Sequence, residues 1–242
     1  MSYLKSKLQC LVNDKIKRIY NLMSNDIYKF NYTDHYFKIN SIQSIKNVFS
    51  KIKMKGLLRD NNIKSPDFQL IDMNNLEKTI NQVIDNFPES GYIGKPNYSF
   101  DDNSSVRLET KNETEEFINK FCKSNYYLEV FINSTKEYNI HVSELGHCFY
   151  SFEKILIDDV EKKNINFDKP DNWLDIIQEC QNARKAVGLD ICNVDVKIDK
   201  DDNFYILNVN VTCLLDDSKI ISAYTAEIKK LKELKCAYMR NK

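Results

Sequence analysis

The fold prediction for this chain starts from the stretch ICNVDVKIDKDDNFYILNVNVT, residues 191–212. Its alternation of apolar and polar residues predicts two β-strands joined by a polar turn. Asp195 lies on the first strand, and Asn208 and Asn210 lie on the second. Because side chains two apart share one face of a strand, both amides are expected to point the same way. The simplest interpretation is a strand pair with one wet face, and the second is that these oxygens hold a hard cation.

Composition limits the classes of protein that fit the chain. It has 242 residues, of which 42% are hydrophobic, enough for one large domain or two small ones. The 35 basic residues balance 35 acidic ones, so no nucleic acid is expected as a partner. No apolar run reaches the roughly 20 residues that a membrane-spanning helix needs, so no membrane is expected either.

The cysteines indicate a reducing compartment. Seven occur between Cys10 and Cys236, and none forms a CxxC pair. This pattern favours free thiols in the cytoplasm over a disulfide framework or a zinc site. The first residues, MSYLKSKLQCLVNDK, lack the apolar core of a signal peptide. The predicted location is cytoplasmic.

The scarcity of glycine excludes several nucleotide-binding folds. The chain has five glycines, about a third of average usage. It contains neither GxGxxG nor GxxxxGK[ST], so the phosphate-binding turns of Rossmann and P-loop proteins are missing. A serine nucleophile elbow is missing too. His35, His141 and His147 are too dispersed to predict a metal cluster, and structural or exposed positions are expected for them.

Residues 3–29 carry apolar side chains three to four positions apart, which predicts an amphipathic helix. Its lysines lie mostly off the apolar stripe. Such a helix either lies on a membrane surface or packs against a domain or partner, and packing is favoured.

The rest of the chain predicts an α+β protein without regular βαβ alternation. A polar segment at 158–172 is expected to be mobile. Helices are predicted at 41–62, 74–86, 113–123, 173–188 and 218–238. A break at Pro66 and a short strand are predicted within 63–72, and the segment 91–100 predicts a strand that ends at Lys95. Further strands are predicted at 126–132, 137–144 and 147–157 and in the hairpin.

Five polar residues fall at strand ends or loops of this layout: Lys51, Lys95, Glu137, Asp195 and Asn210. Each has an ordinary interpretation, since a lysine before a proline is usually exposed and an aspartate before a hairpin usually shapes a turn. In this order, however, lysines on separate elements are suited to neutralise a polyphosphate.

These segments together resemble the ATP-grasp superfamily, in particular the ligases similar to glutathione synthetases and to ribosomal-protein glutamate ligases. The resemblance spans residues 41–217. It implies an α+β fold in which two subdomains hold a nucleotide between them. The implied organisation is an N-terminal extension at 1–40, a truncated form of the family's preceding region, and an ATP-grasp domain at 41–242. Within that domain a lid subdomain is expected at about 66–125 and a metal-hairpin subdomain at about 126–242.

The resemblance assigns several cations to the phosphates of ATP. SKIKMKGLLRDNNIKSP looks like the family's first segment and places Lys51 at its helix lysine. YIGKP is similar to the strand whose lysine reaches the phosphates, here Lys95. Lys154 and Arg107 are the candidate catalytic cations, with Lys154 near the γ-phosphate and Arg107 in the loop that covers it.

The nucleoside is assigned to two further segments. YLEVFI resembles the hinge that reads adenine through backbone groups, with Glu129, Val130 and Phe131 at the contact positions. KEYNIHV is similar to the segment whose acidic residue, here Glu137, faces the ribose.

The opening hairpin resembles the family's magnesium hairpin, with Asp195, Asn208 and Asn210 at the ligand positions. Asn208 stands where the family usually has a glutamate, and Asn139 stands where it usually has an arginine. The loop NYSFDDNSSVRLE lacks the usual glycines. The implied cofactors are ATP and Mg²⁺, and the lost glutamate makes a pair of magnesium ions doubtful.

The function that the resemblance implies is an ATP-dependent carboxylate–amine or carboxylate–thiol ligase that works through an acyl phosphate. Its substrates would be a small-molecule or peptide carboxylate and an amine acceptor. The alternatives are a decayed nucleotide-binding or scaffold protein and a small-molecule kinase. A partner protein or a second copy of the chain is expected to complete the acceptor pocket by docking on residues 3–29.

Overall fold

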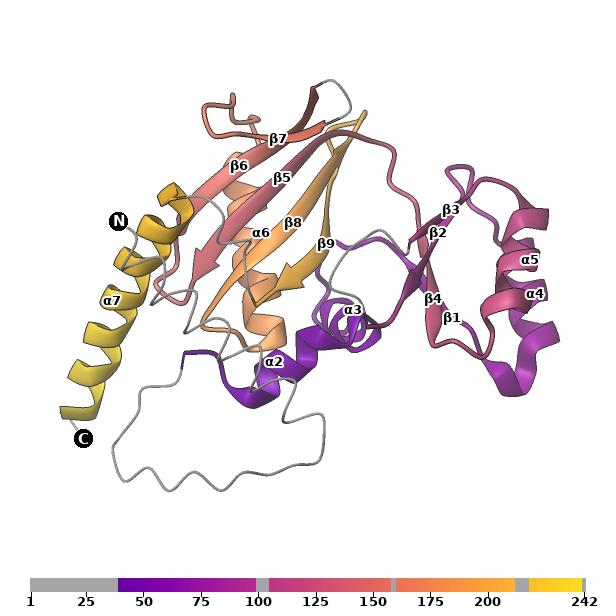
Figure 1. The fold of residues 1–242 in the computed structure, drawn as a ribbon, viewed down its shortest axis with the longest axis horizontal. Coiled ribbons are helices and arrows are strands. Elements are labelled where there is room, and N and C mark those ends of the chain that lie inside the picture. The colour runs from indigo at the N-terminus through magenta and orange to yellow at the C-terminus, as the bar shows by residue number, and fades with distance from the viewer. Residues whose placement is uncertain (1–38, 99–104, 158–159, 212–217, 241–242) are drawn as a thin grey trace. The chain divides into compact units, whose positions relative to one another are not determined.

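The computed structural model describes residues 39–98, 105–157, 160–211 and 218–240 (Figure 1). The described residues belong to two compact units. Asn40–Val211 holds both β-sheets, and helix α7 (Ser218–Arg240) belongs to the second unit. The predicted helix at 3–29 lies outside the described residues. Among the described helices, none is both long and apolar enough to span a bilayer.

The first sheet has four antiparallel strands in the order β1-β4-β2-β3. Helices α4 and α5 cover one of its faces (Figure 1). Short 3-10 helix η1 leads into α4. The elements are β1 (Phe68–Leu70), η1 (Met73–Asn75), α4 (Leu76–Asp85), β2 (Tyr92–Pro96), β3 (Val106–Leu108), α5 (Lys111–Phe121) and β4 (Tyr126–Val130).

The core of this sheet depends on a close contact between a strand and a helix. Helix α5 begins with a capping box, in which Thr110 and Glu113 satisfy each other's backbone N–H groups. This start places Phe117 and Ile118 toward the sheet, where both are buried. The ring of Phe117 lies against Gly94, and a Cβ atom on that glycine would come within 2.2 Å of the ring.

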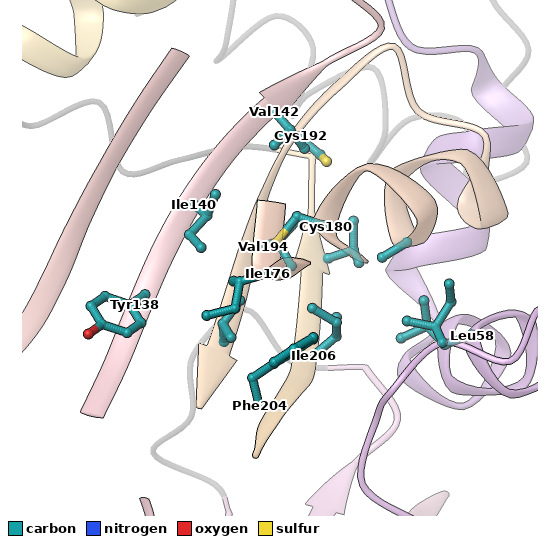
Figure 2. Packing of buried hydrophobic residues seen from close by; sticks show 14 of the residues in the cluster. Leu58, Tyr138, Ile140, Val142, Ile176, Cys180, Cys192, Val194, Phe204 and Ile206 are labelled. Atoms are coloured by element: carbon teal, nitrogen blue, oxygen red, sulfur yellow. The ribbon is translucent and has the colours of Figure 1, made fainter. Parts of the chain in front are cut away.

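The second sheet has five antiparallel strands in the order β7-β6-β5-β8-β9. Helix α6 crosses one face of it (Figure 1). On that face, Tyr138, Ile140 and Val194 meet Ile176 and Cys180 of the helix (Figure 2). The elements are β5 (Ser134–Ser143), β6 (Cys148–Ile157), β7 (Val160–Asn164), α6 (Trp173–Val187), β8 (Ile191–Asp199) and β9 (Phe204–Asn210).

The predicted helix at 41–62 is wrong as a single element. The chain forms α2 (Ile42–Phe49) and α3 (Lys51–Asp60), with a break at Ser50. Ser50 has an extended backbone, and its hydroxyl accepts a hydrogen bond from the N–H of Lys53. A serine in this conformation is a strong N-cap, so a new helix starts at Lys51.

Two further segments differ from the predictions. The polar segment at 158–172 was expected to be mobile, but it includes β7, which pairs with β6 along its length. The structure also places the change of sheet between Val130 and Ser134, because Tyr126–Val130 completes the first sheet between β1 and β2. The helix predicted at 173–188 is confirmed, and it ends at Gly188 in the left-handed conformation (φ 79°).

We expect Gly94→Ala to lower the free energy of unfolding by about 1–3 kcal/mol, because the added methyl group overpacks the site under Phe117. Gly56→Ala is the matched control. A Cβ at Gly56 meets nothing within 4 Å in α3, so this change should stabilise the chain by about 0.5–1 kcal/mol. Urea unfolding followed by circular dichroism measures both. Equal effects of the two substitutions would contradict the close contact.

Candidate functional site

The second sheet presents a polar face opposite α6. Residues alternate along each strand, so the positions between the buried apolar residues share this face. Asp195 lies directly opposite Asn139 on β5 and Asn208 on β9, and Asn193 lies opposite Asn210. The predicted ligand positions therefore do share one face of the sheet. The polar face consists of Glu137, Asn139 and His141 of β5, Lys154 of β6, Asn193, Asp195 and Lys197 of β8, and Asn208 and Asn210 of β9.

Asp195 is the centre of a hydrogen-bonded group on this face. The amide of Asn139 donates to its Oδ1 over 2.7 Å, and the amide of Asn210 donates to its Oδ2 over 2.9 Å. Lys154 Nζ lies 3.5 Å from Oδ1. One ammonium group therefore balances one carboxylate, and both carboxylate oxygens have partners.

Glu137 lies one residue pair along the same face, between two lysines. It pairs in register with Lys154 on β6 and with Lys197 on β8. Lys197 Nζ is 2.8 Å from its Oε1, and the hydroxyl of Ser134 donates to the same oxygen over 3.1 Å. Opposite charges on neighbouring strands stabilise such a row.

His141 also lies on the polar face of the second sheet, where it packs among aromatic rings. Its ring is fully buried and packs against the rings of Phe149, Tyr150 and Phe152. Burial lowers the pKa of His141 to about 3, and Lys163 lowers it further. The imidazole is therefore neutral near pH 7, which fits the structural role predicted for it.

A second charged group is buried between α3 and the first sheet. Lys95 Nζ lies 2.6 Å from Glu129 Oε1, and Lys55 Nζ lies 2.6 Å from Oε2. Lys51 begins α3 one turn before Lys55 and is 8% exposed. Sequence reasoning named Lys51 and Lys95 but missed Lys55. The available signal was the i, i+4 spacing of the two helix lysines, which places them on one face.

The pKa values in this group reflect three lysines around one carboxylate. Burial alone would raise the pKa of Glu129, but Lys55 and Lys95 outweigh it and hold that pKa below its usual value. Burial is the largest cause that holds the pKa of Lys55 below its usual value; Lys95 and Lys51 also lower this pKa, while Glu129 raises it. The group is therefore electropositive and suited to an anion.

Asn97 joins the backbones that carry the lysines. It lies two residues after Lys95, and its carbonyl accepts from the N–H of Lys51 over 3.0 Å. Its side-chain oxygen accepts from the N–H of Ile52 and from the hydroxyl of Ser50, each over 2.9 Å. Asn97 thereby fixes the start of α3 against the end of β2, a role that no sequence pattern indicated.

Two backbone N–H groups of the hinge segment after β4 already have hydrogen-bond partners within the chain. The N–H of Val130 donates to the carbonyl of Asp67 over 2.8 Å, and the N–H of Phe131 donates to that of Gly91 over 3.0 Å. The carboxylate of Glu129 is held by the lysines. The N–H groups of Val130 and Phe131 are therefore already used within the chain. They do not contribute to the predicted recognition of a base through the backbone of this segment.

Arg107 also lies at the hinge. Its guanidinium stacks 3.6 Å from the centre of the Phe131 ring, and its Nη1 donates to the carbonyl of Tyr92 over 3.1 Å. Lys197 lies 5.4 Å from the same ring. Cations from both sheets thus contact Phe131, and the structure places Arg107 against an aromatic ring rather than beside Asp195.

The residues around Asp195 do not fit a magnesium site held by the protein. Magnesium prefers oxygen ligands in a near-ideal octahedron and is usually bound by one or two carboxylates. Asp195 is the sole carboxylate of the predicted ligand set, and amide N–H groups and an ammonium group face it. Within the described ranges, no cluster of three or more His, Cys, Asp or Glu side chains is arranged to hold a metal ion.

Comparisons with known proteins identify the fold. A scan against protein-family models finds no match, and a search of curated proteins by sequence finds no relative. Among solved structures, the ATP-grasp ligase PsnB with precursor peptide PsnA2 and AMPPNP matches with a TM-score of 0.58 and 18% identity. The match covers 78% of this chain and 62% of PsnB.

Two other structures have the same fold. N5-carboxyaminoimidazole synthetase from Staphylococcus aureus with ADP matches with a TM-score of 0.62 and 16% identity over 78% of this chain and 51% of that enzyme. D-alanyl-alanine synthetase A from Vibrio cholerae matches with a TM-score of 0.59 and 15% identity over 69% of this chain and 56% of that enzyme. The chain therefore has the ATP-grasp fold, as its sequence predicted, and it spans between half and two thirds of the length of these neighbours.

We expect Glu129→Gln to lower the free energy of unfolding by about 3–5 kcal/mol, because it leaves Lys55 and Lys95 buried without a carboxylate. Glu116→Gln, on the exposed side of α5, should change stability by less than about 0.5 kcal/mol. Urea unfolding at pH 7 measures both. A loss no larger than that of the control would mean that the ion pairs do not stabilise the fold.

The stability difference between the wild type and Glu129→Gln should depend on pH in a defined way. The folded pKa of Glu129 lies below the value of 4.5 that a free side chain has, so its stabilising contribution is complete above pH 4.5. It is lost as the pH falls through the folded pKa. The stability difference between wild type and Glu129→Gln should therefore stay constant from pH 7 to pH 4.5 and shrink below that value. A difference that does not change on acidification would contradict the assigned pKa direction.

Proposed function

We propose that this protein is an ATP-dependent ligase that joins a carboxylate to an amine, or to a thiol, through an acyl phosphate. The observation that carries this proposal is the buried group of Lys51, Lys55 and Lys95 around the single carboxylate of Glu129, inside an ATP-grasp fold. Such a group binds a polyanion more readily than any neutral ligand. Neighbours solved with ADP or ATP support a nucleotide as that polyanion.

The residues divide between the two ends of the nucleotide. Lys51 and Lys95 hold phosphates, while Lys55 keeps Glu129 in place between the strands. Lys154, on the polar face of the second sheet, meets the terminal phosphate. Phosphoryl transfer needs mainly positioning and neutralised charge, and these side chains supply both.

The nucleoside lies toward the hinge in this proposal. Glu137 faces the ribose, and the segment Glu129–Phe131 borders the base. Arg107 belongs to this end, because it stacks on Phe131. Its predicted catalytic role stays a prediction, and we add a role in shaping the hinge.

The reaction has two balanced steps. A carboxylate oxygen of the donor attacks the γ-phosphorus of ATP, and the bond to ADP breaks with its electrons staying on ADP. The amine nitrogen then attacks the acyl carbon, phosphate leaves with the bonding electrons, and the amine proton passes to solvent. The chain contributes by holding the γ-phosphoryl group in line with the carboxylate.

The donor and acceptor are proposed by class. PsnB was solved with its precursor peptide, and the Vibrio enzyme is a D-alanyl-alanine synthetase, which supports a peptide or amino-acid substrate. The predicted docking of a partner protein or a second copy on residues 3–29 stays a prediction, because those residues lie outside the described part of the chain.

A nucleotide-binding protein without turnover is the second candidate. It is favoured by the sole carboxylate at Asp195, since the usual second acid is Asn208. Product analysis distinguishes the candidates. A ligase releases free phosphate together with a condensed product, a kinase releases ADP and a phosphorylated acceptor, and a decayed protein releases neither.

We expect Lys51→Met to weaken binding of ADP and of a non-hydrolysable ATP analogue by about tenfold or more, because a phosphate loses a point charge. Lys78→Met is the control, since Lys78 is exposed on α4 and should leave affinity unchanged. Isothermal titration calorimetry measures all three proteins. If the wild type binds neither nucleotide at about 1 mM, the ligase proposal should be dropped.

A further inference from the structure

We propose that Lys154 takes the place of a protein-held metal ion at Asp195, so that this chain binds its nucleotide without needing magnesium. The inference rests on the proposed nucleotide site, and it concerns which cation meets the terminal phosphate. It follows from the side chains around Asp195 and from the charges on the neighbouring strands.

The hydrogen bonds of Asp195 oppose metal binding in two ways. Its Oδ1 accepts from Asn139 and lies 3.5 Å from Lys154 Nζ, and its Oδ2 accepts from Asn210. A magnesium ion on this carboxylate would require the amides to rotate and present oxygen instead of nitrogen. It would also bring a divalent cation close to a fixed ammonium group, which is repulsive.

Among the described residues that pair in register with Asp195 or Lys154, the one acid is Glu137. Glu137 is opposite Lys154 in register, but it already pairs with Lys197 over 2.8 Å. Asn208, directly opposite Asp195, is neutral. The strand beyond Lys154 adds a further cation in register, Lys163 of β7. The face is thus nearly neutral before any ligand binds.

The position of Lys154 suits it to contact a phosphate. Its side chain is 25% exposed, and Asp195 orients its ammonium group. A lysine is a compact point charge on a flexible stem and binds phosphate oxygens without fixed directions. The ammonium group of Lys154 therefore neutralises phosphate charge that a dissolved cation would otherwise neutralise, and no metal ion has to bind.

The test measures binding by isothermal titration of the full chain with ADP and a non-hydrolysable ATP analogue, in excess magnesium and in EDTA. We expect removal of magnesium to change the wild-type Kd by less than about threefold, and Lys154→Met to weaken binding in EDTA by about tenfold or more. Lys78→Met is the control. Lys78 is exposed on α4, so the Kd of this variant should equal that of the wild type.

A variant designed to depend on magnesium tests the same inference in the opposite direction. Lys154→Met combined with Asn208→Glu removes the ammonium group and adds a carboxylate opposite Asp195. This double variant should bind nucleotide about tenfold more tightly with magnesium than without it. Lys154→Gln serves as a second neutral variant if the methionine protein does not fold, with circular dichroism as the check.

The outcomes separate this inference from the proposed function. Wild-type binding that tightens tenfold or more with magnesium, and that neutral substitution of Lys154 leaves unchanged in EDTA, overturns the inference but leaves the nucleotide site standing. Absence of binding to the wild type in both conditions overturns the nucleotide site and the inference together. Magnesium-independent binding that requires Lys154 supports both.

Discussion

The ion pairs of Glu129 with Lys55 and Lys95 are the constraint on which the junction between α3 and the first sheet depends. A buried carboxylate is stable only when it is paired, because the loss of hydration is otherwise uncompensated. Glu129 therefore holds helix α3 and strand β2 at fixed distances from β4. Asn97 adds backbone hydrogen bonds at the same junction. Together these contacts define where Lys51 and Lys95 lie, so the ion-pair network and the proposed phosphate-binding site have Lys95 in common.

The second sheet positions its polar groups by a different route. Its strands bury one face against α6, and the register that buries Tyr138, Ile140 and Val194 necessarily places Asn139 and Asp195 on the opposite face. A slip of one residue would exchange the two faces completely. The apolar core therefore fixes the register of the polar face, and no separate interaction is required to bring Asp195 opposite Asn208.

The sequence predicted the features that depend on local patterns and missed those that depend on contacts between distant residues. Alternation is a local pattern, so the strand pair and the shared face of Asp195, Asn208 and Asn210 were visible in one hairpin. The role of Lys55 was not, because burial of a lysine depends on a carboxylate 74 positions away in the chain, at Glu129. The break at Ser50 was hidden since serine is tolerated within helices, and its contact with the distant residue Asn97 supports the new cap there. β7 escaped notice because charged residues are typical of edge strands and also of loops.

The two charged groups differ in a way that bears on the chemistry. Around Glu129 the lysines outnumber the carboxylate and are buried, so their positive charge is preorganised and weakly screened. Around Asp195 one ammonium group faces one carboxylate at a partly exposed site. A phosphate that binds between Lys154 and Asp195 would exchange one anionic partner of the lysine for another, at little cost in reorganisation. The backbone register of the hairpin can therefore persist while its charges change, because the core of the sheet specifies the register and the polar face specifies the charges of the proposed site.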